Sequence, residues 1–401
     1  AYSNRVLELL NGGVHIAPAA VLYHGESEWM GDAMASDVVG HQLYDHQIDY
    51  DYIPQDVFLP ENAYDMEITY DAERVEGSFR VNTQNYRVLI VPKLQFITPH
   101  MKAALKQLQA AHFPVYFVDG LPEGVEGEVV PLSELAERLR KSGISEITIT
   151  PENNRIRYYH YEHVDGSAVY MFVNEGNSIY EGTVEMPESR ACYAYGAWEN
   201  TIQDAEAVRD ETTGITKVSL VLEPLKSYLL VFESREKAEA ILKEKTTPIS
   251  GEGVEIPFIG TWQRSICRSI EYPHFKAKKE VTIPDRLHEE EPEFSGFVRY
   301  ENRFEGEEAA TYILEISDAY EGVEVFLNGK SLGIQIVPSY RYELSSYVKD
   351  GENEIAIEVA TTLEREMAKY PNPYAKYIGQ EVKPSSFSGI TGEVRLLKHE
   401  N

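Results

Sequence analysis

The sequence predicts a multidomain chain in which an α/β domain, residues 1–150, is followed by two all-β domains, residues 151–234 and 254–401. Three observations predict this class. Strand-like and helix-like segments alternate in the first domain, whereas strand-like runs follow one another at short spacing in the second. In the third, runs of alternating apolar and polar residues flank tight turns. The stretch 235–253, charged at first and then turn-forming, is predicted to be a linker.

The alternation in the first domain indicates a parallel, doubly wound sheet. A helix is expected over Val6–Leu10, and it ends at Gly12-Gly13. The expected strands are Ala19–Tyr23, Ile48–Ile53, Tyr86–Val91 and Pro114–Asp119. The other expected helices are Asp32–Asp49, Pro99–His112 and Leu132–Lys141. Thr98 is a suitable N-cap for the helix at Pro99, because proline is tolerated at the first helical position.

The clearest β signal lies in the third domain, over Gly322–Ala360. Val323, Val325 and Leu327 alternate with polar residues, as in a half-buried strand. Asn328-Gly329 then predicts a hairpin, since a type I′ turn needs positive φ at both central residues. Further strands are expected in the second and third domains over Val169–Asn174, Gly182–Met186, Lys217–Leu222, Ser227–Phe232, Phe294–Phe304, Thr311–Ile316, Ile355–Val359 and Ser388–Leu397.

Composition excludes several classes of function. The formal net charge of −29 argues against binding to nucleic acid, which needs Lys and Arg on phosphates, and against an anionic membrane surface. No apolar run approaches membrane-spanning length. Cys192 and Cys267 lie in different expected domains and form no CxxC pair, so we expect packed thiols. Neither GxGxxG nor a P-loop occurs, and no cofactor is expected.

One candidate site, residues 23–29 (YHGESEW), follows the first parallel strand, at whose carboxyl end open α/β sheets bind ligands. Gly25-Glu26-Ser27 is close to a nucleophile elbow, but Trp29 replaces the second glycine of that motif. A serine esterase centred on Ser27 needs a base, for which the nearby candidates are His24, His41 and His46. The other interpretation is that Glu26 and Trp29 contact a sugar or a neighbouring domain.

Two further groups of polar residues are candidates. On a helix, Asp45 would share a face with His41 and with Asp49, but no recognised metal-binding spacing occurs, so no metal site is predicted. In the third domain, Trp262, Arg264 and Arg341 are candidates for sugar binding. Tyr340 and Tyr342 are expected on the opposite face of their strand from Arg341, packed in a core.

Three segments carry a resemblance to a known family. They are residues 4–23, which run into the first strand, residues 157–176 (RYYHYEHVDGSAVYMFVNEG) with 222–228, and the closing 388–396 (SGITGEVRL). The last is similar to a Ser-Gly-Leu-x-Gly-Pro-Val ending, with Glu393 where proline is common. In this order they resemble the C-terminal region of multidomain glycoside hydrolases such as α-L-rhamnosidases and β-galactosidase-like enzymes.

The resemblance implies a flavodoxin-like (class I glutamine amidotransferase-like) domain, a small β-sandwich and a galactose-binding-like jelly roll. Amidotransferase chemistry is excluded, because no cysteine nucleophile occurs anywhere in the first domain; Pro92-Lys93-Leu94 follows the strand that ends at Val91. Glycoside hydrolysis needs two carboxylates flanking the scissile bond, usually on barrel strands, and no such pair is recognisable here. The resemblance therefore places the catalytic acid and base in a (β/α)₈ barrel upstream of residue 1.

The expected function is thus that of a non-catalytic region that braces the barrel and binds carbohydrate. Its expected partners are the upstream barrel of the same polypeptide and a carbohydrate ligand, and related α/β domains also mediate assembly of identical chains. A serine esterase and a free-standing carbohydrate-binding protein are the alternatives.

Overall fold

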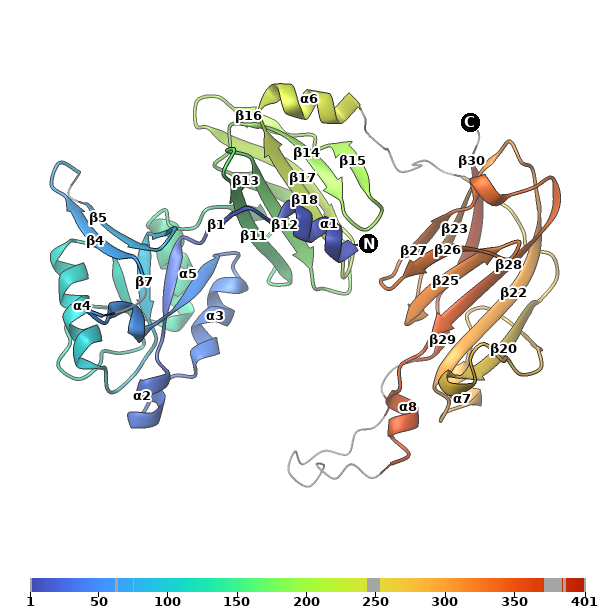
Figure 1. Ribbon diagram of the computed structural model, residues 1–401, viewed down its shortest axis with the longest axis horizontal. Helices are drawn as coiled ribbons and strands as arrows, with labels where there is room; N and C mark the ends of the chain where they lie inside the picture. The colour runs from blue at the N-terminus through green and yellow to red at the C-terminus, as the bar shows by residue number, and fades with distance from the viewer. Residues whose placement is uncertain are drawn as a thin grey trace. The chain divides into compact units, whose positions relative to one another are not determined.

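The computed structural model describes residues 2–61, 64–74, 76–243, 253–370, 384 and 387–399 (Figure 1). The chain divides into two compact units, Ala1–Pro248 and Ile249–Asn401. Their boundary falls within the stretch predicted as a linker, of which residues 244–252 lie outside the described part. Among the helices of the described part, none is both long and apolar enough to cross a bilayer.

The α/β domain is built on a five-stranded sheet in which every neighbouring pair is parallel. In sheet order the strands are β3 (Tyr50–Pro54), β2 (Ala19–Tyr23), β7 (Val88–Val91), β8 (Val115–Val118) and β9 (Glu128–Val130). The strand order reverses at β2: the next strand, β3, lies on one side of β2, and β7, β8 and β9 follow in chain order on the other side. The short, continuously apolar runs of β2, β7 and β8 fit a sheet that is buried on both faces.

Helices cover both faces of this sheet (Figure 1). They are α4 (Pro99–Ala110) on one face and α3 (Ser36–Tyr44) and α5 (Leu135–Lys141) on the other, whereas the short α2 (Gly25–Met30) follows the carboxyl end of β2. Leu22 and Leu89 share a core with α4, whereas Val21 and Ile90 share a second core with α3 and α5. Residues 25–30 are helical, although no helix was predicted there, and the helix predicted over 32–49 is confined to α3.

An antiparallel sheet that was not predicted lies beside the parallel one. It consists of β4 (Met66–Asp71), β5 (Glu76–Val81) and β6 (Gln84–Tyr86). Met66 and Ile68 of β4 alternate with polar residues and pack against the core, whereas the other residues of the strand are exposed. Short 3-10 helices cover Gln55–Phe58 and Leu132–Glu134.

The rest of the first unit is a sandwich of two antiparallel sheets. The larger sheet contains β1 (Gly13–His15), β11 (Ile156–His163), β12 (Ala168–Asn174), β18 (Ser227–Glu233), β14 (Ala191–Gly196) and β15 (Thr201–Asp204). The smaller contains β10 (Thr148–Thr150), β13 (Tyr180–Met186), β17 (Ile215–Leu222) and β16 (Val208–Asp210). Side chains of both sheets form one core, which includes Ile156, Phe172, Val184 and Leu220.

The N-terminal segment belongs to this sandwich, although residues 1–150 were predicted to form the α/β domain. β1 pairs with β11, Gly13 opposite His163. α1 (Tyr2–Leu9) and α6 (Arg235–Lys243) share an apolar cluster with the outer face of the large sheet, to which Val6 and Ala238 contribute. The α/β domain is therefore inserted between β1 and β10 of the sandwich.

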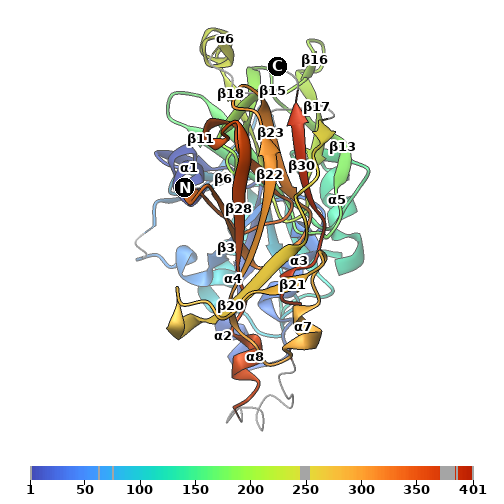
Figure 2. The ribbon, with the colours of Figure 1, turned by 90° about the vertical axis from the view of Figure 1, so that its right-hand side faces the viewer.

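The second unit is also a sandwich of two antiparallel sheets, with an additional strand pair. Figure 2 shows β20, β22 and β28 of the six-stranded sheet side by side. That sheet contains β21 (Lys279–Val281), β20 (Trp262–Arg268), β22 (Gly296–Gly306), β28 (Gly351–Ala360), β25 (Gly322–Leu327) and β26 (Lys330–Gln335). The other sheet contains β19 (Val254–Glu255), β30 (Val394–His399), β23 (Thr311–Ile316) and β27 (Tyr340–Glu343). The remaining elements are the pair β24 (Ala319–Tyr320) and β29 (Gly389–Ile390), the helices α7 (Leu287–Glu290) and α8 (Glu364–Met367), and 3-10 turns at Ser269–Glu271 and Ser345–Tyr347.

The predicted Asn328-Gly329 turn is confirmed. Both residues have positive φ, 51° and 79°, and Leu327 pairs with Lys330 across the hairpin of β25 and β26. The apolar positions that alternate along β25 and β28 are buried in the core between the two sheets. The opposite positions on these strands therefore form the outer face of the sheet.

Candidate ligand-binding groove

The outer face of the six-stranded sheet carries charged side chains because its strands alternate strictly. On β22, Val298, Tyr300 and Phe304 point into the core. Arg299 and Glu301 therefore point outward. The sequence contains this signal, in FVRYENRF, but outward charges on a strand are ordinarily solvated and do not by themselves indicate a site.

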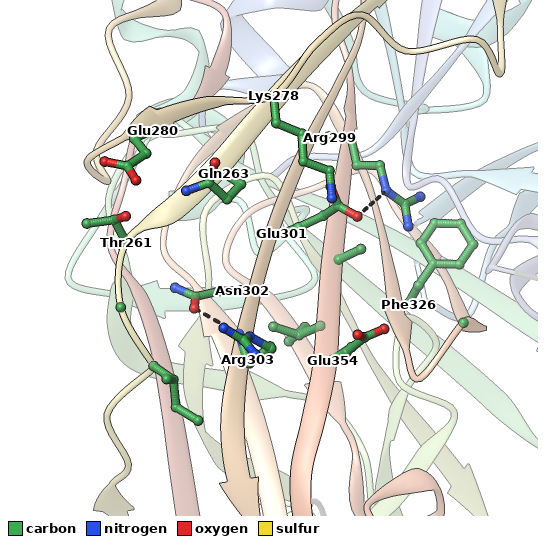
Figure 3. A pocket seen from close by; sticks show the side chains of 15 residues that line it. Thr261, Gln263, Lys278, Glu280, Arg299, Glu301, Asn302, Arg303, Phe326 and Glu354 are labelled. Carbon is green, nitrogen blue, oxygen red and sulfur yellow. Dashed lines mark hydrogen bonds and ion pairs between the residues drawn. The ribbon is translucent and has the colours of Figure 1, made fainter.

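These side chains line a groove of about 580 Å³ (Figure 3). That volume is within the range of small-ligand pockets. The groove is built by β20, β21, β22, β25 and β28 and by the segment that leads into β20. Its lining includes Gly260, Thr261, Gln263, Lys278, Glu280, Arg299, Glu301, Asn302, Arg303, Phe326, Glu354 and Ala356.

The Arg299 guanidinium is held in the groove by two carboxylates and an aromatic ring. Its Nη1 lies 2.6 Å from Glu358 Oε1 and its Nε 3.5 Å from Glu301 Oε1. Its guanidinium carbon is 5.4 Å from the centroid of the Phe326 ring. Lys278 Nζ is 2.7 Å from the other oxygen of Glu301. Charged hydrogen-bonding groups and one aromatic ring are thus fixed in position before any ligand arrives.

Asn302 carries an unpaired donor on the core-facing side of β22, the side that Val298 and Tyr300 share. The residue is 7% exposed, and its Oδ1 accepts a hydrogen bond from the backbone N–H of Arg303 at 2.8 Å. Its Nδ2 has no hydrogen-bond partner in the part of the chain that the structure describes. A buried donor left unpaired costs about 1–3 kcal/mol. A buried water that accepts from Nδ2 would recover that free energy.

Two of the residues predicted to bind sugar lie in the core of the second unit, out of reach of a ligand in solution. Trp262 is 8% exposed and packs against Phe258, with ring centroids 4.8 Å apart. Arg264, on the same face of β20, donates from Nη1 to both oxygens of Asp285, at 2.7 and 3.0 Å, and from Nη2 to Glu290 at 2.6 Å. The physical reason is the alternation of β20, which turns both side chains inward.

Arg341 is exposed, but it lies on β27 of the other sheet, where its Nε is 3.0 Å from Glu315 Oε1. It does not belong to the residues that line the groove. Tyr340 and Tyr342 are buried on the opposite face of β27, as predicted.

Glu26 and Trp29 lie on α2, which follows the carboxyl end of β2. The Glu26 carboxylate accepts a hydrogen bond from Gln55 Nε2 at 3.0 Å, and the indole of Trp29 is 87% exposed. Their predicted contact with a sugar or a neighbouring domain stays a prediction.

The environment of Ser27 offers no support for a nucleophile. Its side chain is buried, and its Oγ lies 3.4 Å from Gln55 Nε2. The imidazole of His24 is directed at backbone oxygens instead, 2.7 Å from Met34 O and 3.3 Å from Leu22 O. Of the other candidate bases, His46 bonds the Gln42 carbonyl and His41 lies near Asp37. These contacts do not include the hydrogen bond between the serine hydroxyl and a histidine base that an esterase needs.

The predicted helical face of His41, Asp45 and Asp49 does not form, because α3 ends at Tyr44. Asp49 instead lies 2.8 Å from Nε2 of His15, whose Nδ1 is 3.3 Å from Asp51. Burial disfavours the charged imidazole, but hydrogen bonds to the two carboxylates and their attraction outweigh it and raise the pKa of His15 to about 9. The His15 ring also stacks on Tyr159 of the sandwich. Its ion pairs with Asp49 and Asp51 therefore connect the sandwich to the α/β domain.

No protein-family model and no curated protein matches the chain. Among solved structures, the chain is similar to the rhamnosidase from Novosphingobium sp. PP1Y, with 17% identity and a TM-score of 0.64 over 99% of this chain and 40% of that one. Shorter likenesses include the alpha-L-fucosidase isoenzyme 2 from Paenibacillus thiaminolyticus (9% identity, 58% of this chain and 51% of that chain, TM-score 0.38) and the Faecalibacterium prausnitzii beta-glucuronidase (12% identity, 38% and 33%, TM-score 0.29).

These structural neighbours are glycoside hydrolases. The likeness that extends over nearly all of this chain spans about two fifths of the rhamnosidase. The chain therefore has the fold of part of a glycoside hydrolase.

Proposed function

We propose that the chain is a non-catalytic, C-terminal region of a glycoside hydrolase and that its second unit binds carbohydrate in the groove. The observation that carries the first part is the extent of the rhamnosidase likeness, 99% of this chain against 40% of that one. The remainder of such a protein would hold a catalytic (β/α)₈ barrel, which this region braces. A rhamnosidase-like substrate class follows as part of the same proposal.

The finer assignment of the domains belongs to this proposal. The strand order β3-β2-β7-β8-β9 supports a flavodoxin-like domain of the glutamine amidotransferase-like kind. The two antiparallel sheets of the second unit, with the groove on the outer face of one, support a galactose-binding-like jelly roll. Their roles are to shape the surroundings of the barrel and to hold substrate close to it.

The groove suits a sugar in its chemistry. Sugar hydroxyls both donate and accept hydrogen bonds, and the groove offers them carboxylates and the Arg299 guanidinium. Phe326 supplies an apolar ring for the C–H face of a sugar. Most of these groups lie on adjacent strands of one rigid sheet, which limits the ordering cost of binding.

Calorimetric titration of the chain with mono- and oligosaccharides, rhamnosides among them, tests the groove. Phe326→Ala is expected to weaken binding by roughly ten-fold, about 1.4 kcal/mol. Ile334→Ala is the matched control, because Ile334 is 67% exposed on the same sheet and does not line the groove. Failure of every sugar to bind, or equal affinity for both variants, would refute the assignment of the groove.

The non-catalytic part of the proposal has a separate test. The isolated chain is expected to leave chromogenic rhamnosides and galactosides uncleaved. Turnover by the purified chain that survives removal of contaminants would overturn it, whatever the outcome of the titrations.

A further inference from the structure

A cluster of three metal-capable side chains lies in the sandwich of the first unit, apart from the groove. His160 and Glu162 are two residues apart on β11 and so share its inward face. Glu188 comes from the turn that follows β13. One ligand atom of each residue lies within 4.8 Å of those of the other two.

A hydrogen bond to Glu146 fixes the orientation and the tautomer of the His160 imidazole. Its Nδ1 lies 2.8 Å from Glu146 Oε1, and the hydroxyl of Tyr158 donates to the other oxygen of Glu146. An ionised carboxylate can only accept hydrogen bonds, so the proton resides on Nδ1. The ring also stacks on Tyr170, with centroids 4.0 Å apart and planes at 15°. The Nε2 of a neutral His160 therefore carries a lone pair, and the position of the ring fixes the direction in which that lone pair points.

That lone pair is unused. His160 is 3% exposed, and its Nε2 has no hydrogen-bond partner among the residues that the structure describes. A buried, unpaired polar atom is uncommon and costs free energy. A histidine whose Nδ1–H is given to a carboxylate while its Nε2 is bare is the arrangement that metal-ligating histidines adopt.

We propose that His160 Nε2 and the carboxylates of Glu162 and Glu188 bind a divalent transition metal, Zn²⁺ in the first instance. One imidazole with two carboxylates suits zinc, whereas Mg²⁺ and Ca²⁺ prefer oxygen ligands alone. A tetrahedral zinc site spaces its ligand atoms by about 3.3 Å. Small side-chain rotations close the present spacing, and a water completes the coordination.

Arg190 is the competitor for this site. Its Nε donates to Glu188 Oε2 at 2.8 Å, its Nη2 also donates to Oε1 of that carboxylate, and Nη2 lies 3.6 Å from Glu162 Oε1. The guanidinium thus neutralises the carboxylates that a metal would use. The Arg190 side chain is 26% exposed, so it can turn toward solvent when a metal arrives. Removing its charge should therefore strengthen metal binding.

The experiment is a titration of the full chain with Zn²⁺ by calorimetry and with Co²⁺ by visible absorption. We expect one ion per chain and Co²⁺ bands of a tetrahedral nitrogen–oxygen site. Glu162→Gln should weaken binding by at least ten-fold, and Arg190→Gln should tighten it several-fold. Glu146→Gln should weaken it by about ten-fold, as loss of the carboxylate behind a ligating histidine does. Glu181→Gln, an exposed position on β13, is the matched control and should change nothing.

The chain contains 11 histidines, so binding alone does not identify the site. The proposal is overturned if no ion binds at about 1 mM, if Glu162→Gln and the Glu181→Gln control bind equally, or if Arg190→Gln weakens binding. Circular dichroism of each variant verifies that it is folded.

Discussion

Replacing Arg264 by methionine should destabilise the second unit strongly, because it leaves a buried carboxylate short of partners. The Asp285 side chain is 2% exposed and accepts two hydrogen bonds from Arg264, one from the Tyr300 hydroxyl at 2.6 Å and one from the backbone N–H of Arg286 at 2.8 Å. Arg264→Met removes the two charge-assisted hydrogen bonds that Nη1 donates to this carboxylate. Breaking a buried ion pair from one side typically costs about 3–5 kcal/mol.

Differential scanning calorimetry and urea unfolding measure this loss. A loss of about 3–5 kcal/mol corresponds to a fall of roughly 10 °C in the melting temperature of a unit of this size. Arg303→Met is the matched control on the neighbouring strand β22. The Arg303 side chain is 51% exposed and pairs with Glu352 at 3.1 Å, so its removal should cost less than about 1 kcal/mol.

A double variant distinguishes the unpaired charge from lost packing. Arg264→Met with Asp285→Leu removes both partners and should be more stable than Arg264→Met alone. The reasoning is refuted if Arg264→Met costs less than about 1 kcal/mol, or if the double variant is no more stable than the single one.

Three further outcomes are expected. His15 has a raised pKa of about 9 in the folded chain, so the stability from its contacts with Asp49 and Asp51 is full below about pH 6.5 and is lost as the pH rises through about 9. Urea unfolding at pH 6 and pH 10 should differ by roughly 2 kcal/mol after allowance for partial exposure, and a His15→Gln variant with the same difference would contradict this. Burial raises the pKa of the Cys192 thiol to about 12, so iodoacetamide should label it far more slowly in folded than in unfolded chain, and equal rates by mass spectrometry would count against it. Gly389 has φ of 79° and lies against the hydroxyl of a core tyrosine, so Gly389→Ala should lower the free energy of unfolding by roughly 3 kcal/mol, and an unchanged melting temperature would argue otherwise.

Local patterns in the sequence were sufficient for much of the fold. The alternation of β25 and the Asn328-Gly329 turn depend on neighbouring residues, so they could be predicted, as could the parallel strands and the helix at Pro99. Pairing of Gly13 with His163 could not, because nothing local to β1 distinguishes its partner. In β4, Met66, Ile68 and Tyr70 alternate with polar residues, so this strand carried a short periodic signal that the prediction missed.

The candidate sites were harder to predict, because residue type was given more weight than strand face. Trp262 and Arg264 are residue types that bind sugars, yet their positions on β20 point inward. Arg299 and Phe326 point outward from two strands that are far apart in sequence, and only the sheet brings them to one groove. The position of His160 next to Glu188 likewise depends on the packing of two sheets.

The insertion of the α/β domain between β1 and β10 has a consequence for folding on the ribosome. β1 is synthesised before the inserted domain and cannot pair with β11 until that whole domain has been synthesised. The inserted domain has its own cores and can fold in the meantime. Its completion brings its two ends to the sandwich, which shortens the effective loop between β1 and β11 and lowers the entropic cost of closing the large sheet. A destabilised α/β domain should therefore slow the assembly of the sandwich, even where no sandwich residue has changed.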